Sequence, residues 1–142
     1  MKRTIAMLSI LALTGCASMG DVVRAKESGS EGVTRVYPVT PEQAWDISKM
    51  VFHWEGANDI EPHRDQGYML TSSGWNVFSW GTYMGAWIRP IDANNTEVTV
   101  VTKRKASMSL VTKLTESKYH RRFEEAVGIV KSGQPLPLSR PR

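Results

Sequence analysis

The sequence lacks most of the features on which disulfide bonding, membrane spanning and catalysis depend. Its 142 residues include one cysteine, so no internal disulfide can form. The longest apolar run, Ile5 to Leu13, has nine residues, whereas a membrane-spanning helix needs about 20. No serine sits in a nucleophile elbow. The histidines, His53, His63 and His120, have no partner at a spacing typical of metal ligands.

These absences favour a non-enzymatic protein that needs no metal and no other cofactor. His63 and Asp65 could meet on one face of a strand, but two exposed side chains beside a turn are the simpler interpretation. An enzyme would be indicated only if a hydrolytic activity disappeared when either residue was substituted.

The net charge of +4 overstates how basic the mature chain would be. Two of the positive charges, Lys2 and Arg3, lie in an N-terminal segment that we expect to be cleaved off, as argued from the residues below. The remaining 16 basic and 14 acidic side chains leave about +2. A nucleic-acid-binding protein needs a strongly basic stripe, so no nucleic acid is expected as a partner. Basic residues do gather at Lys103-Arg104-Lys105, Lys113, Lys118, Arg121 and Arg122. They could contact lipid phosphates or an acidic partner, although a solvated surface is the simpler interpretation.

What the sequence does contain is an export signal at its N-terminus. Lys2 and Arg3 precede the apolar run, and small residues lead into Cys16. A charged start, a short apolar segment and a small-residue cleavage site follow the order of a secretory signal. The tetrapeptide Leu13-Thr14-Gly15-Cys16 resembles the lipobox of a bacterial lipoprotein. This resemblance implies cleavage between Gly15 and Cys16, loss of residues 1–15, and lipidation of Cys16.

The same resemblance predicts where the protein resides. It implies three acyl chains on Cys16, and two or more chains anchor a protein stably at ~0.8 kcal/mol per buried methylene. Ala17 follows the cysteine, at the position where an aspartate would signal retention in the inner membrane. We therefore expect attachment to the outer membrane through the lipid, with the protein facing the periplasm.

The chain divides into four parts. After the signal peptide of residues 1–15, residues 16–31 comprise the lipidated cysteine and small or charged residues without periodicity, which predicts a flexible tether. Such a coil would hold the next part on the order of 20 Å from the bilayer. Residues 32–132 form one periplasmic domain, and residues 133–142, with three prolines, form an extended, solvated tail.

Periodicity predicts the elements of that domain. The segment Thr40-Pro41-Glu42-Gln43 supplies a capping box and a proline at the first helical position, and helical spacing continues to Gly56. A second helix is expected over Glu116 to Lys131. Strands are expected at 33–39, 58–64, 68–72, 82–90 and 96–103, of which the last two form the strongest hairpin.

The element order β-α-β-β-β-β-α predicts an α+β fold with a single antiparallel sheet and two helices packed on one face. This is a helix-grip-like arrangement. The first strand with the segment from Tyr37 to Trp45, followed by the meander, resembles small bacterial envelope lipoproteins of uncharacterised function. The layout is also similar to the helix-grip domains of BamC-like lipoproteins of the β-barrel assembly machine. The likeness is one of topology, so it implies a role in envelope assembly by analogy alone.

Aromatic residues gather in one stretch of 13 residues that is interleaved with glycines. They are Trp75, Phe78, Trp80, Tyr83 and Trp87. Tryptophan suits interfaces and ligand clefts because its ring combines a large apolar area with one N–H donor, so this stretch is the candidate interaction surface. For Trp87 a place in the core is the more economical interpretation. For Trp75 and Trp80 both interpretations stay open.

Two functional hypotheses follow. The first is a non-enzymatic, lipid-anchored adaptor or accessory in cell-envelope assembly or maintenance, with an envelope protein as its partner. The second is a binding module that holds a small apolar ligand or lipid between helix and sheet near Trp75–Trp87.

Overall fold

The computed structural model describes residues 17–29, 31–73, 81–105 and 115–142. Gly15 and Cys16 lie outside these ranges, as do Trp75, Phe78 and Trp80. The signal peptide, the lipidation site and three of the five residues of the candidate aromatic surface therefore stay predictions.

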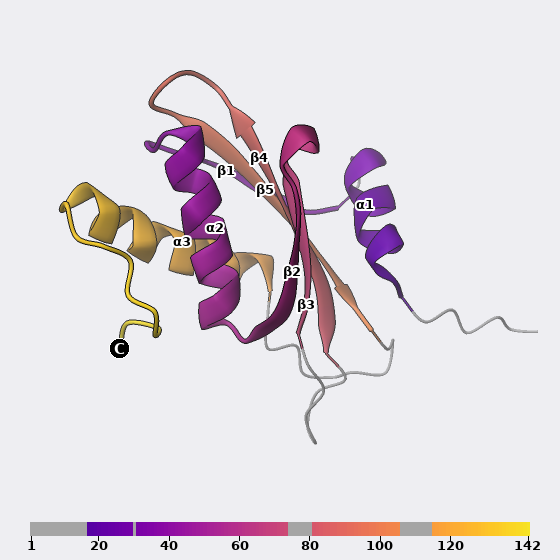
Figure 1. Ribbon diagram of the computed structural model, residues 1–142. Helices are drawn as coiled ribbons and strands as arrows, with labels where there is room; N and C mark the ends of the chain where they lie inside the picture. Colours follow the sequence, from indigo (N-terminus) through magenta and orange to yellow (C-terminus); the bar gives the residue numbers. More distant parts are fainter. Residues whose placement is uncertain (1–16, 30, 74–80, 106–114) are drawn as a thin grey trace, which may run out of the picture.

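The fold is built on one antiparallel sheet of five strands in the order β1-β5-β4-β3-β2 (Figure 1). The strands are β1 (Val33–Tyr37), β2 (Ala57–His63), β3 (Tyr68–Ser73), β4 (Thr82–Pro90) and β5 (Thr96–Arg104). Each expected strand is present, with its ends moved by no more than two residues. The hairpin predicted to be strongest pairs along its whole length, from Thr82 opposite Arg104 to Pro90 opposite Thr96.

Both expected helices cover the same face of the sheet. They are α2 (Pro41–Trp54) and α3 (Glu116–Lys131). The predicted capping box of α2 is present: Gln43 N–H donates to Thr40 Oγ1 at 3.2 Å, and Thr40 N–H donates to Gln43 Oε1 at 3.0 Å. The C-terminal helix α3 lies across the sheet beside α2 (Figure 1). The chain thus has the predicted α+β, helix-grip-like fold.

The main core fills the space between these two helices and the sheet. As their alternation predicts, Met84 and Ala86 of β4 and Val98 and Val100 of β5 point to this side. The helices contribute the fully buried rings of Phe52, Tyr119 and Phe123. Rings from α2, α3 and β1 pack against one another at tilted angles, with centroids 4.3 Å apart for Tyr37 and Phe123 and 5.1 Å apart for Phe52 and Tyr119.

A third helix, α1 (Met19–Glu27), covers the opposite face of the sheet (Figure 1). The prediction of a flexible tether is wrong for these residues. Asp21 Oδ2 accepts a hydrogen bond of 2.6 Å from the Ser18 N–H, which closes the first turn. Val22 and Ala25 are buried against Leu70 and Val101. Helices therefore lie on both faces of the sheet, and not on one face only.

The C-terminal residues also differ from the expected solvated tail. They form no helix or strand, but Leu136 packs against the main core. The Trp54 indole N–H donates to the Pro137 carbonyl oxygen at 2.9 Å. The prolines prevent regular structure, yet these two contacts attach the segment to α2.

Within the described ranges, no helix combines the length and apolarity that crossing a bilayer requires.

The packing of α1 can be tested by substitution. Val22→Ala removes two buried methyl groups and should lower the free energy of unfolding by about 2 kcal/mol, measured by urea denaturation of the chain without residues 1–16. Val36→Ala, whose side chain is 55% exposed, is the matched control and should change it by less than ~1 kcal/mol. Equal, small effects of both substitutions would mean that α1 is not docked.

Candidate functional site

An open apolar groove lies beside α2. Four α2 residues line it at positions i, i+3, i+4 and i+7: Asp46, Lys49, Met50 and His53. This spacing places them in one stripe, next to the stripe that α2 buries in the core. Ile60 of β2 and the C-terminal Leu136 and Leu138 complete the groove, whose volume is about 530 Å³. We call these seven residues the α2 groove.

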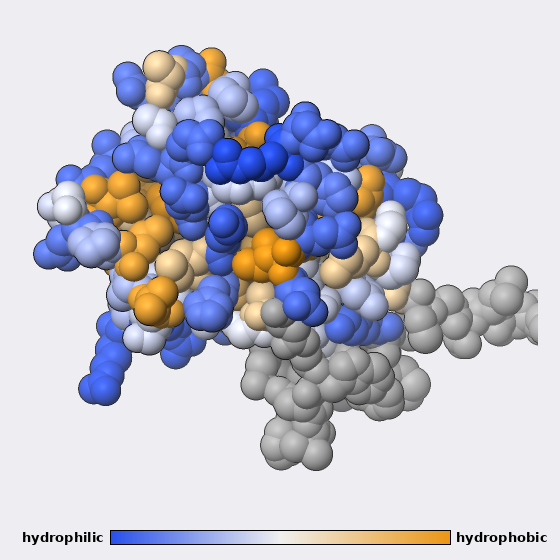
Figure 2. Space-filling view, in the orientation of Figure 1, coloured by the Kyte–Doolittle hydropathy of each residue, from blue (hydrophilic) through white to orange (hydrophobic). Residues whose placement is uncertain are grey.

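The α2 groove has an apolar interior and a polar margin. Met50, Ile60 and Leu136 are partly buried against the core, whereas Leu138 is 80% exposed. Charged and polar side chains come from the α2 stripe alone. Figure 2 shows separate apolar patches within a mostly hydrophilic surface on the side where α2 and the C-terminal segment lie. An elongated apolar molecule with one polar end would match this arrangement.

A buried carboxylate helps to hold the C-terminal segment in place. The side chain of Glu55, at the end of α2, is only 2% exposed. Its oxygens lie 2.6 Å from Lys118 Nζ, 3.2 Å from Arg122 Nε and 3.9 Å from Arg140 Nη1. These cations come from α3 and the C-terminal segment, so one carboxylate joins three parts of the chain. Part of the basic concentration noted in the sequence therefore serves internal ion pairs.

A second hollow, of about 350 Å³, lies near the start of α2 and includes Trp45, Arg64 and Gly67. The Arg64 guanidinium stacks over the Trp45 ring at 4.9 Å and pairs with Glu42 at 3.0 Å. Because its cation is already neutralised and its ring already covered, this hollow is less suited to a ligand than the α2 groove.

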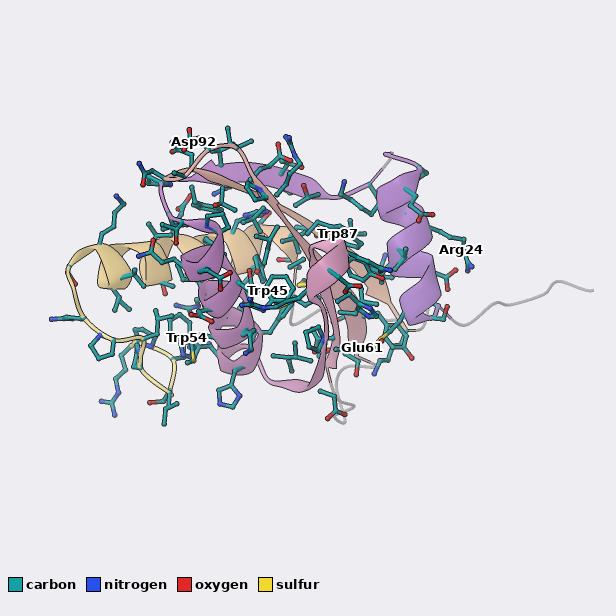
Figure 3. All side chains as sticks on the ribbon, turned by 45° about the horizontal axis from the view of Figure 1, so that its top comes forward. Arg24, Trp45, Trp54, Glu61, Trp87 and Asp92 are labelled. Atoms are coloured by element: carbon teal, nitrogen blue, oxygen red, sulfur yellow. The ribbon has the colours of Figure 1, made fainter. Side chains whose placement is uncertain are left out.

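The described part of the candidate aromatic surface lies on the α1 side of the sheet. Tyr83 and Trp87 pack against the cluster formed by Val22, Ala25, Leu70 and Val101. Figure 3 shows Trp87 on the side of the sheet that faces α1, while Trp45 and Trp54 lie on the α2 side. The rings of Tyr83 and Trp87 are half-buried. A ligand held between α2 or α3 and the sheet would therefore not touch them.

Gly85 explains how the Trp87 ring fits under α1. A Cβ added at Gly85 would lie 2.5 Å from the Trp87 ring, so the ring occupies space that any other residue would fill. The Trp87 ring stacks on the Tyr68 ring, with centroids 5.5 Å apart. Lys26 Nζ of α1 lies 6.0 Å from the centroid of the Trp87 ring.

The histidines occupy three different environments. His53 lines the α2 groove and is exposed. His63 contacts Glu61, with Nε2 and Oε1 2.9 Å apart, and stacks on Tyr68. Among the described residues, no group of three or more His, Cys, Asp or Glu side chains could hold a metal ion.

His120 is fully buried and joins α3 to β1. Its Nε2 lies 2.9 Å from the Val33 carbonyl oxygen and its Nδ1 lies 2.7 Å from the Tyr37 hydroxyl. Since a carbonyl can only accept, Nε2 carries the proton, and Nδ1 accepts from the hydroxyl. Burial lowers the pKa of His120 below its ordinary value and raises that of Tyr37. Both ring nitrogens are thus engaged in holding the fold together.

No family model and no curated protein matches this chain, and the similarities found are to solved structures. Ara h 8.0201 is 12% identical, with a TM-score of 0.40 over 71% of this chain and 96% of that one. TTHA0849 from Thermus thermophilus is 12% identical, with a TM-score of 0.38 over 70% and 97%. The di-domain ARO/CYC StfQ from the steffimycin biosynthetic pathway is also 12% identical, with a TM-score of 0.35 over 72% of this chain and 44% of that chain.

At these identities the likeness concerns the fold alone. The function must be argued from the residues of this chain.

Acid should weaken the fold through His120. At neutral pH its imidazole is uncharged in both states. As the pH falls below about 6.5 the unfolded chain binds a proton first, because the pKa in the folded protein is lower. The free energy of unfolding should therefore fall as the pH is lowered from about 7.5 through the pKa of the unfolded imidazole.

Urea denaturation of His120→Gln and of the matched control His53→Gln tests whether the acid dependence of stability comes from His120. His120→Gln should lose most of the acid dependence, and His53→Gln should keep it. The carboxyl groups of Asp21, Asp92 and Glu97, whose pKa values are lowered by hydrogen bonds, titrate at lower pH. An unchanged acid dependence in His120→Gln would contradict the assignment.

Proposed function

We propose that the protein is a lipid-anchored, non-enzymatic module of the periplasm that binds an apolar ligand in the α2 groove. The observation that carries this proposal is the convergence of four apolar side chains from α2, β2 and the C-terminal segment on one open groove. Its volume of about 530 Å³ falls within the range of roughly 300–1,000 Å³ typical of ligand sites.

The chemistry of the groove defines the class of ligand. Met50 adapts its shape to different apolar partners because its side chain is unbranched and polarisable. Lys49 and His53 stand at the margin, where either could donate a hydrogen bond to a polar end group. These features favour an amphipathic molecule with an acyl or similar chain. This ligand site differs from the one expected near Trp75–Trp87.

The lipid anchor is supported by the order of the N-terminal residues, which ends in Gly15 and Cys16. Acylation of Cys16 would attach the protein to the outer membrane at its periplasmic face. A groove for apolar molecules at that location would give the protein a role in handling lipids or other envelope components without chemical conversion.

An adaptor role in envelope assembly is the second candidate function, and one observation favours it. β1 is an edge strand of the sheet, and it exposes 37% of Val33 and 55% of Val36. A partner could add a strand there by main-chain hydrogen bonding. Crosslinking of the lipidated protein to one specific envelope protein, and loss of that product in Val36→Lys, would favour this role.

Binding of a fluorescent fatty acid tests the first candidate. The wild-type chain should bind it saturably, and Met50→Asp should weaken binding about tenfold, which corresponds to ~1.4 kcal/mol. The control Ile91→Asp places the same charge on a residue that is 48% exposed and lies outside the groove, so affinity should not change. Absence of saturable binding, or equal effects of both substitutions, would contradict the proposal.

A further inference from the structure

The docking of α1 on the sheet limits the distance between the expected lipid and the folded domain. The expected lipid site, Cys16, precedes the first residue of α1 by three positions. Three residues span at most about 11 Å even when fully extended. Because α1 is packed on the sheet and does not hang free, the lipid cannot be far from the folded domain.

The direction of α1 identifies which end of the domain is nearest the lipid. In its last turn, Lys26 lies over the Trp87 ring and beside Glu97, toward the β4–β5 turn. Its first turn therefore lies toward the opposite end of the hairpin, and Met19 packs against the same cluster as Tyr83. In Figure 1 the chain enters α1 toward the end of the sheet where β3 ends and β4 begins, far from the β4–β5 turn.

The chemistry of that end suits a lipid headgroup layer. β4 begins there with Thr82, and β5 ends there with Lys103 and the exposed Arg104, which Lys105 follows. Lys103 pairs with Glu31, and Lys105 Nζ donates to the Ser73 carbonyl oxygen at 3.0 Å. Lys105 Nζ lies 4.8 Å from the centroid of the Tyr83 ring. A tyrosine with basic neighbours is well placed between an apolar and an aqueous phase, and cations are attracted to anionic lipid surfaces.

We infer that the domain lies directly on the bilayer, with the first turn of α1 and the Lys103–Lys105 end against the headgroups and the β4–β5 turn pointing away. This orientation rests on the proposed lipid anchor. It replaces the picture of a domain that rotates freely on a coil about 20 Å from the membrane.

Two single-cysteine labels measure the orientation in the full-length lipidated protein, since acylation blocks the thiol of Cys16. Gly20→Cys lies in the first turn of α1, where an added Cβ makes only ordinary contacts. Ala93→Cys lies in the exposed β4–β5 turn. Each carries a fluorophore, and the protein is placed in vesicles of phosphatidylethanolamine and phosphatidylglycerol that contain a headgroup-attached quencher. The label at residue 20 should be quenched several-fold more than the label at residue 93.

A flexible Gly-Ser insertion between Ala17 and Ser18 is the matched control. It keeps the lipid but frees the domain, so the difference between the two labels should largely disappear. Equal quenching of both labels in the vesicle-bound protein without the insertion would overturn the orientation while leaving the anchor intact. If Cys16→Ser binds vesicles as well as the wild type, the anchor fails, and the inference fails with it.

Charge reversal tests the headgroup contact separately. Arg104→Glu should reduce quenching of the label at residue 20, and more so as the share of phosphatidylglycerol rises. Arg121→Glu, an exposed position on α3, is the control and should leave quenching unchanged. Equal effects of the two reversals would remove the Lys103–Lys105 end from the contact surface.

Discussion

The two-sided burial of the β4–β5 hairpin is the constraint on which the rest of the structure depends. One face carries Met84 and Val98 toward α2 and α3, and the other carries Trp87 and Val101 toward α1. Strands that are apolar on both faces need cover on both sides. With α2 and α3 committed to one face, α1 supplies the cover for the other. A domain of this size without disulfides depends on both layers for its stability.

That constraint links the fold to the proposed lipid anchor and to the groove. Because α1 must dock, the segment expected to separate the lipid from the domain becomes part of the domain. The other face gains a second attachment at the C-terminus, where Trp54 donates to Pro137 and Glu55 gathers cations from α3 and from Arg140. These contacts place Leu136 beside α2 and so create the groove. Both features depend on segments at the ends of the chain.

The interior elements were predictable because their signals are local. The Thr40–Gln43 capping box and the alternation from Thr82 to Pro90 each determine an element within a few residues. The periodicity of the sequence does not indicate α1, because its nine residues are of mixed polarity and carry a weak helical pattern. Two other features of the sequence do point to it. Ser18 and Asp21 can cap a helix, and the face of the β4–β5 hairpin that carries Trp87 and Val101 is too apolar to be left exposed to water. The α2 groove was beyond prediction, since the hydrogen bond from Trp54 to Pro137 joins residues 83 positions apart.

α1 is a packed element of the domain and not a tether. Amide hydrogen exchange of the lipidated protein in vesicles measures this packing most directly. The amides of Val22 to Lys26 should exchange orders of magnitude more slowly than in an unfolded chain, because opening them requires α1 to leave the sheet. Exchange of these amides at the rate of an unstructured peptide, while those of β4 stay protected, would contradict the docking of α1.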